Sequence, residues 1–150
     1  KGADSAYLAL GKLYTSEKKT EDAKAAFQKY MEKHPKDADA LEQLASIAAD
    51  AGDYADAATY YKDAMEAASG DQVKELQKAL VAVYEKNGDF ASALEEAKDY
   101  VADYPEDETM QKEYEFLQTR VLTGLENTGT DNTQPADDTA ADTTTEGNGQ

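Results

Sequence analysis

Few residues of this chain are suited to catalysis or to metal binding. It contains one His and no Cys, so disulfides, thiolate metal sites and cysteine nucleophiles are absent. The single His, His34, precedes Pro35 in what reads as a turn, and no Ser and Asp accompany it in the pattern of an acyl-transfer triad. We therefore expect a non-enzymatic protein without a catalytic residue, a metal or a cofactor.

The acidic residues do not form a recognisable catalytic or calcium-binding motif. Adjacent carboxylates such as Glu95-Glu96 and Asp137-Asp138 arise without design among 32 Asp and Glu residues. The stretch 131–133 lacks the alternating oxygen ligands, central Gly and closing Glu of a calcium loop. We interpret these acids as solvated surface.

The charge of the chain limits the classes of partner. The formal net charge is −17: residues 1–124 hold all 15 Lys and Arg against 26 Asp and Glu, and residues 125–150 hold six acids and no base. This field repels phosphate backbones and anionic lipid headgroups, so we expect no nucleic acid and a partner of basic or mixed charge. Solubility alone would also explain the acidity.

The location of the protein is left open. No apolar run approaches the ~20 residues of a bilayer span, so we expect no membrane insertion of this chain. The start at Lys1 without Met indicates a processed or trimmed product, and a catalytic domain preceding it stays an open alternative. The lack of Cys and the Thr- and Asp-rich end lean toward a bacterial cell-envelope or secreted protein.

Apolar residues recur at a period of 34 and then 36 residues. In the first two blocks, an amphipathic helix with apolar residues at i, i+3, i+4 and i+7 precedes a second helix with an Ala-x3-aromatic pattern, and the third block matches this pattern in part. The first block is Tyr7, Leu10, Gly11, Tyr14, Ala23, Phe27 and Pro35; the second is Leu41, Leu44, Ala45, Ala48, Ala57 and Tyr61; the third is Leu80, Val81, Tyr84, Ala93 and Pro105. Over residues 4 to 107 this pattern resembles the tetratricopeptide repeat (TPR) family.

The resemblance implies an all-α fold, a right-handed α-solenoid of three TPR helical hairpins followed by a capping helix. The repeats are expected at about 4–37, 38–71 and 74–107, and the capping helix at about 108–123. These seven helices form one predicted domain, residues 1–124. Residues 125–150, with seven Thr and six acids, form a predicted disordered acidic tail.

Local signals predict where the helices begin and where the array is irregular. The expected N-caps are Asp4-Ser5, Thr20 and Asp37, and Gly52 is expected to end the third helix. The second repeat closes at Ser69-Gly70 instead of a Pro, with two extra residues, which predicts an irregular link before the third repeat.

Two groups of residues in the repeats need an interpretation. In the third repeat, Gln77 replaces a large apolar residue and Ala97 replaces an aromatic, so its two helices are expected to pack differently. Six of the ten tyrosines lie on the apolar stripes and are predicted to be core residues: Tyr7, Tyr14, Tyr30, Tyr61, Tyr84 and Tyr100. Tyr54, Tyr60 and Tyr104 fall off the stripes and are predicted to be exposed contact residues.

In TPR proteins, ligand peptides commonly lie on the concave wall formed by the first helix of each hairpin. On this chain, the resemblance implies that the wall carries the partner-binding candidates Lys12, Asp39, Glu42, Gln43, Ser46, Asp50, Glu75, Lys78, Glu85 and Lys86. The expected function is a protein–protein interaction scaffold or adaptor that binds a peptide or segment on this acidic face. The alternative is a structural, self-associating assembly module that uses Tyr60 and Tyr104.

One known ligand class of the family is disfavoured. TPR co-chaperones hold the acidic C-terminal tail of heat-shock chaperones with a clamp of Lys, Asn, Asn, Lys and Arg. The corresponding residues here are Leu8, Lys12, Gln43, Glu75 and Ala79. Glu75 would repel a carboxylate where the clamp attracts it, so we expect chaperone C-terminal tails not to bind.

Overall fold

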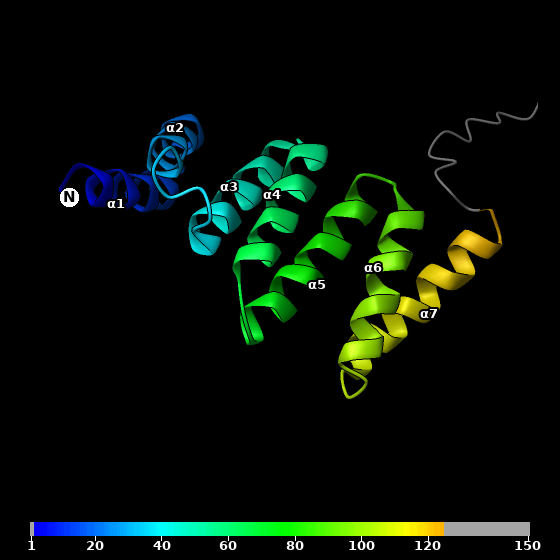
Figure 1. Cartoon of the computed structure of the whole chain (residues 1–150). Helices are drawn as coiled ribbons and strands as arrows, with labels where there is room; N and C mark the ends of the chain where they lie inside the picture. Colours follow the sequence, from blue (N-terminus) through cyan, green and yellow to red (C-terminus); the bar gives the residue numbers. More distant parts are fainter. Residues whose placement is uncertain (1, 125–150) are drawn as a thin grey trace, which may run out of the picture.

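The fold is an array of helical hairpins. A computed structural model describes residues 2–124, and within this range every regular element is an α-helix. The seven helices are α1 (Gly2–Ser16), α2 (Thr20–Met31), α3 (Ala38–Ala51), α4 (Tyr54–Ala67), α5 (Asp71–Lys86), α6 (Phe90–Asp103) and α7 (Glu108–Leu122). They line up in chain order, with α1 at one end and α7 at the other (Figure 1). The predicted α-solenoid of three hairpins and a final helix is confirmed, while the predicted tail lies outside the described residues.

Several helix ends follow directly from local sequence. Asp37 is the N-cap of α3, and its carboxylate accepts a hydrogen bond from the Ala40 backbone N–H at 3.1 Å, as predicted. Asp89 and Asp107 cap α6 and α7 in the same way. Gly52 ends α3 in the left-handed conformation, with φ of 85°, which a residue without a Cβ adopts at low cost.

Two predicted helix starts were wrong. α1 begins at Gly2, before the expected Asp4-Ser5 cap. The Asp4 carboxylate lies 3.0 Å from the Lys33 ammonium of the α2–α3 turn, so it joins two segments instead of capping its own helix. Thr20 is the first residue of α2, whose N-cap is Lys19, with no side-chain hydrogen bond at the cap.

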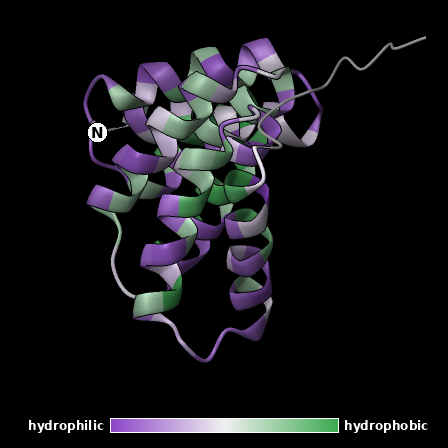
Figure 2. Ribbon diagram, turned by 90° about the vertical axis from the view of Figure 1, so that its right-hand side faces the viewer, coloured by the Kyte–Doolittle hydropathy of each residue, from purple (hydrophilic) through white to green (hydrophobic). Residues whose placement is uncertain are grey.

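Apolar side chains from neighbouring helices form the core. In the ribbon of Figure 2, the most hydrophobic segments lie mainly toward the middle of the array. One cluster joins the first hairpin to α3; its buried members are Ala23, Phe27, Tyr30, Ala40, Leu44 and Ile47. A larger cluster continues from α3 to α7 and ends at Met110 and Leu117. Because each hairpin is buried only by its neighbours, stability is distributed along the array.

The first hairpin pairs a small residue with a large one at the point where its two helices approach. A Cβ at Gly11 would lie 2.8 Å from ring atoms of Phe27, so the α1–α2 contact leaves no room for a side chain. The equivalent pairs are Ala45 with Tyr61 and Val81 with Ala97, all buried. As the residue on the first helix grows from Gly to Val, its counterpart shrinks from Phe to Ala. This compensation explains how the third repeat accommodates Ala97.

The other departure in the third repeat, Gln77, is buried on α5. Its side-chain amide donates a hydrogen bond to the Glu96 backbone carbonyl of α6, at 3.4 Å. A polar side chain is tolerated at this apolar position because it has found a partner.

Two of the three junctions between consecutive hairpin units carry the same polar contact. The Tyr30 hydroxyl donates to the Asp37 carboxylate at 2.6 Å, and the Tyr100 hydroxyl donates to the Asp107 carboxylate at 2.8 Å. In each contact the Tyr precedes the Asp by seven residues, and the Asp is the N-cap of the next helix. We call this Tyr–Asp contact the junction clasp. At the α4–α5 junction, Ala64 occupies the position of the Tyr, and the N-cap of α5 makes no side-chain hydrogen bond. This junction is the link in which the sequence predicts an irregularity.

The predicted roles of the tyrosines are only partly correct. Tyr30, Tyr61, Tyr84 and Tyr100 are buried, as expected. Tyr14 is half-buried and Tyr7 is 38% exposed, because α1 lies at the end of the array. Tyr54, Tyr60 and Tyr104 are half-buried and pack against the larger core cluster, so the prediction that they are exposed contacts was wrong.

Candidate functional site

The acidic candidates on α3 carry charge that is not neutralised by a neighbouring base. Asp39, Ser46 and Asp50 are exposed on this helix, and Glu42 and Gln43 are half-buried. Among residues 2–124, no ion pair involves Asp39, Glu42 or Asp50. α3 therefore presents three carboxylates that are free to attract a cation.

A side chain of α5 holds two of these carboxylates in place. The Gln72 amide donates a hydrogen bond of 2.8 Å to Asp39 and a longer one of 3.5 Å to Glu42. Asp39 and Glu42 are three residues apart on α3 and thus lie on one face of that helix. The contact shows that the faces of α3 and α5 that carry the candidates adjoin each other.

Asp50 lies at the other end of α3, where it lines a pocket of about 250 Å³ between α1, α2 and α3. The remaining lining residues are Thr15, Lys18, Thr20, Ala23 and Ile47. Burial raises the pKa of Tyr61 on α4, and the carboxylates of Glu42 and Asp50 raise it further. The negative charge of α3 is therefore felt by the neighbouring helix.

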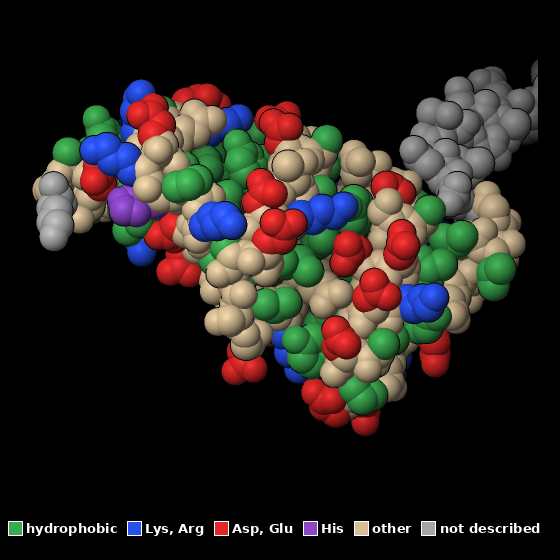
Figure 3. Space-filling model, viewed as in Figure 1, with side chains coloured by type: hydrophobic (Ala, Val, Ile, Leu, Met, Phe, Trp, Pro, Cys, Tyr) green, Lys and Arg blue, Asp and Glu red, His purple; other side chains and the backbone are tan. Residues whose placement is uncertain are grey.

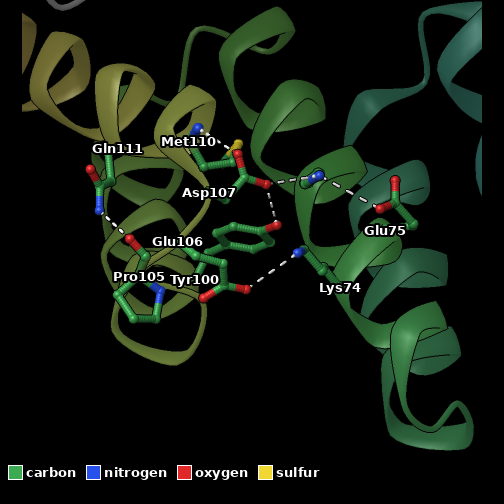
Figure 4. A network of polar contacts seen from close by, with 9 residues as sticks. Lys74, Glu75, Tyr100, Pro105, Glu106, Asp107, Met110 and Gln111 are labelled. Atoms are coloured by element: carbon green, nitrogen blue, oxygen red, sulfur yellow. Dashed lines mark hydrogen bonds and ion pairs between the residues drawn. The ribbon is translucent and has the colours of Figure 1, made fainter.

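Lys78 is engaged in a structural network with Asp107 and Glu75. Figure 4 shows the surroundings of this network, with Tyr100, Asp107 and Glu75 labelled. The Lys78 ammonium lies 3.0 Å from the Asp107 carboxylate and 3.6 Å from that of Glu75. The Tyr100 hydroxyl and the Lys78 ammonium hold the pKa of Asp107 below its usual range, and Asp107 and Tyr100 raise the pKa of Lys78. Lys78 thus joins α5 to the α6–α7 junction through Asp107.

Lys74, one turn before Lys78, strengthens the same junction. Its ammonium lies 3.7 Å from the Glu106 carboxylate and 5.0 Å from the centre of the Tyr104 ring. Across the turn, the Gln111 amide donates to the Pro105 carbonyl. The contact with Lys74 accounts for the half-buried state of Tyr104. Because Lys74 and Lys78 pair with Glu106 and Asp107, the third repeat has fewer unpaired charges than its sequence indicates.

Glu85 faces another carboxylate across α5 and α7. Burial raises the pKa of Glu85 to about 7, the nearby Glu113 carboxylate contributes in the same direction, and the Arg120 guanidinium opposes the shift. Arg120 stacks over the Phe90 ring, with its guanidinium carbon 3.8 Å from the ring centre. Glu85 at the α5–α7 end of the candidate surface therefore ionises less readily than an exposed carboxyl.

The structure brings the sequence-predicted residues together in three groups. Lys12 is exposed on α1, the acidic group with Gln43 and Ser46 lies on α3, and Glu75, Lys78, Glu85 and Lys86 lie on α5. Sequence reasoning missed Gln72, Glu113 and Asp107. Glu113 stands 34 residues after Ala79, so extending the repeat register into α7 would have found it.

Other kinds of site find little support in the described part of the chain. No cluster of three or more His, Asp or Glu side chains among residues 2–124 has the arrangement of a metal site. Within the same range, no helix combines the length and apolarity that crossing a membrane requires.

Comparisons with known proteins agree with this architecture. Residues 8–72 match the family model described as Tetratricopeptide repeat. The structure is similar to the N-terminal domain of stress-induced protein-1 (STI-1) from C. elegans, with a TM-score of 0.69, 17% identity, and coverage of 79% of this chain and 98% of that one. It is also similar to the TPR2B domain of yeast Sti1 in its complex with pHsp70, with a TM-score of 0.61, 16% identity, and coverage of 83% and 99%.

A search of the curated proteins gives no match. At 16–17% identity the structural likenesses establish the fold alone. The family match places tetratricopeptide repeats within residues 8–72, and the structural likenesses show that the described helices have the fold of such repeats, which generally serves protein–protein interaction.

Proposed function

We propose that this protein is a non-enzymatic scaffold or adaptor that binds a peptide or segment of a partner protein on the face formed by α1, α3 and α5. The observation that carries the proposal is the set of carboxylates on α3 without a basic partner among residues 2–124: Asp39, Glu42 and Asp50. Their charge favours a partner segment that is basic or of mixed charge.

The geometry of Asp39 and Glu42 suits a Lys or Arg side chain of such a segment. Both carboxylates are already oriented by the Gln72 amide, so little side-chain freedom is lost when a ligand binds. A guanidinium or ammonium that adds to this arrangement forms charge-assisted hydrogen bonds, which are stronger than the neutral amide contacts. Lys12 and Lys86, exposed on the flanking helices, would contact acidic residues of a mixed segment.

Acidic chaperone tails are the ligand class that this face fits least. The five clamp positions hold Leu8, Lys12, Gln43, Glu75 and Ala79, so only Lys12 supplies a cation. Glu75 already neutralises part of the Lys78 charge, at 3.6 Å, and adds negative potential near the middle of the face. The complex of the similar Sti1 domain with pHsp70 therefore does not predict the ligand of this chain.

The test measures peptide binding by fluorescence anisotropy. A panel of Lys- and Arg-containing peptides is compared with sequences in which each base is replaced by an acid, at low and at physiological salt. We expect only the basic peptides to bind, and to bind more weakly as salt rises. The triple variant Asp39→Lys, Glu42→Lys and Asp50→Lys should weaken binding by about tenfold or more.

The matched control places the same charge change on another helix. Asp56, Asp63 and Glu66 are exposed on α4, and their replacement by Lys changes the net charge equally. Binding should stay within about threefold of the unmodified protein in this control. Equal losses in both triple variants, or binding of the acidic peptides, would show that the α3 carboxylates do not form the site.

A further inference from the structure

The outer side of the first hairpin exposes apolar side chains that the second repeat buries. Tyr7 and Leu10 on α1 are 38% and 37% exposed, and Leu13 is 49% exposed. Their counterparts 34 residues further along, Leu41 and Leu44, are only 4% and 3% exposed. The difference arises because α3 packs against a preceding hairpin, whereas within residues 2–124 no helix precedes α1.

Tyr7 and Leu10 border a groove of about 230 Å³ between α1 and α2. Tyr7, Leu10 and Tyr14 line it from α1, and Asp22, Ala25 and Lys29 line it from α2. Its middle is apolar and its ends carry opposite charges. Exposed apolar area bordered by charged groups is typical of an interaction surface.

The α2 side of this groove is complementary to itself. Ala25 and Ala26 stand at its centre, Asp22 lies three residues before this pair, and Lys29 lies three residues after it. In an antiparallel pair of α2 helices with a two-fold axis between the alanines, each Asp22 therefore faces the partner's Lys29. The small alanine side chains allow the two helices to approach closely.

Charge also favours this end of the molecule for contact with a second copy. Residues 1–36 contain eight Lys and five acids, whereas residues 37–124 contain seven Lys and Arg and 21 acids. Figure 3 shows Lys side chains interspersed with acids at the α1–α2 end, while acids dominate over the later helices on the face shown. Two copies therefore repel each other least where their first hairpins meet.

The opposite end of the array does not fit this groove. In α7, Glu115 and Gln118 occupy the positions that Val81 and Tyr84 occupy in α5, where both are buried. Glu115 is exposed and Gln118 half-buried, so the outer side of α7 is polar. Head-to-tail stacking would place these polar groups against the apolar side chains of α1.

We propose that two copies of this chain associate through their first hairpins, so that α1 and α2 pack against α1 and α2 of the partner around a two-fold axis. The apolar side chains of α1 then become buried in the same way as their counterparts in the second repeat. This interface leaves the carboxylates of α3 accessible, and it stands independently of the proposed peptide site.

The first experiment measures mass by sedimentation velocity or light scattering over a concentration series of the whole 150-residue chain. We expect a reversible dimer, and a chain that stays monomeric up to about 100 µM would overturn the proposal.

Leu10→Lys should raise the dimer dissociation constant by at least about tenfold. Leu122→Lys is the control, because Leu122 is the most exposed large apolar side chain among residues 2–124, at 85%, and lies at the end of α7. A dimer that dissociates in the Leu122 variant but not in the Leu10 variant also contradicts the proposal.

The second experiment tests the two-fold symmetry by exchanging charges. Asp22→Lys and Lys29→Asp should each weaken the dimer by about tenfold or more, because each places like charges opposite one another. The double variant should restore the dimer to within about threefold of the original, since it reverses each pair without changing net charge. Failure of the double variant to recover would overturn the antiparallel arrangement. Circular dichroism of each variant verifies that the helices remain folded.

The third experiment uses the absence of Cys from the chain. A single Ala25→Cys substitution lies beside the proposed axis and should give a disulfide-linked dimer under mild oxidation. Ala102→Cys, the same substitution at an exposed position on α6, should stay uncrosslinked. Equal crosslinking of the two variants would contradict the proposed interface.

Discussion

At the scale of single residues, Gly11 shows how a packing contact overrides helix propensity. In the interior of a helix, Ala is favoured over Gly by about 1 kcal/mol. A Cβ at Gly11 would nevertheless lie 2.8 Å from the Phe27 ring, which is fully buried and cannot move into solvent. We expect Gly11→Ala to lower the free energy of unfolding by about 1–3 kcal/mol, measured by urea denaturation.

Gly2 supplies the control for that substitution. It belongs to the same helix, and a Cβ there would meet no atom within 4 Å. Gly2→Ala should therefore be neutral or slightly stabilising. If Gly11→Ala proves as stable as Gly2→Ala, the close approach of α1 and α2 does not limit the side chain at position 11.

Glu85 is the residue whose ionisation should oppose folding near neutral pH. Burial and the Glu113 carboxylate raise the pKa of Glu85 to about 7, above the ordinary value of 4.5, so between these pH values the folded protein binds a proton more tightly than the unfolded chain does. Stability therefore falls as pH rises from about 4.5 to about 7. Glu85→Gln removes this dependence and should raise Tm at pH 8 with little change at pH 4.

The control for the Glu85 prediction is Glu95→Gln, an exposed position on α6. Scanning calorimetry of both variants from pH 4 to pH 8 distinguishes them. A Glu85→Gln profile parallel to that of the unmodified protein would mean that Glu85 and Glu113 do not share a proton in the folded state.

At the scale of elements, the junction clasp determines how one hairpin is joined to the next. The Asp of each clasp uses one carboxylate oxygen to cap the following helix and the other to accept a tyrosine hydroxyl of the preceding helix. Two helices are thereby oriented by one side chain. The α4–α5 junction lacks both parts, which gives the irregularity predicted from Ser69-Gly70 a physical basis.

The clasp at the first junction can be tested by removing one hydroxyl. Tyr30→Phe keeps the buried ring but loses the 2.6 Å hydrogen bond to Asp37, so unfolding should become easier by about 1–2 kcal/mol in urea. Tyr61→Phe is the control, because Tyr61 is equally buried and its hydroxyl makes no hydrogen bond among the described residues. Equal effects of the two substitutions would argue against the clasp.

The clasp also predicts the alkaline limit of stability. The hydrogen bond to Asp37 raises the pKa of Tyr30 to about 12, above the ordinary value of 10.0. A raised pKa means that the stabilisation is complete below pH 10 and is lost as pH rises toward 12. Tyr30→Phe should lose part of this steep alkaline decrease in Tm, measured between pH 8 and pH 11.

At the scale of the whole molecule, the two ends of the array differ in chemistry. The α1 end exposes Tyr7 and Leu10, whereas Glu115 and Gln118 make the outer side of α7 polar. The charge follows the same direction, because bases exceed acids only in the first hairpin. Partner peptides and a second copy are thus expected on different surfaces, the α3 face and the first hairpin respectively.

The candidate site was only partly predictable from the sequence. The repeat register correctly assigned the acidic candidates to the first helices of the hairpins, and Asp39 and Glu42 lie beside α5. It treated Lys78 as an available contact residue, although its ammonium is held between Asp107 and Glu75. The pairing of Lys78 with Asp107 joins residues 29 positions apart, a separation at which the register of one helix gives no information.

The sequence by itself determined the hairpins, the buried stripes and the caps at Asp37 and Gly52. The caps depend on interactions between residues close in the chain, and the stripes depend on a repeat that places equivalent residues in equivalent surroundings. Only the tertiary structure decided which charges remain free and which apolar residues remain exposed. Tyr7 and Leu41 occupy the same position in the repeat, yet among residues 2–124 only Leu41 has a preceding hairpin that buries it. Exposure is a property of the completed array and of its ends, whereas periodicity is a property of the chain.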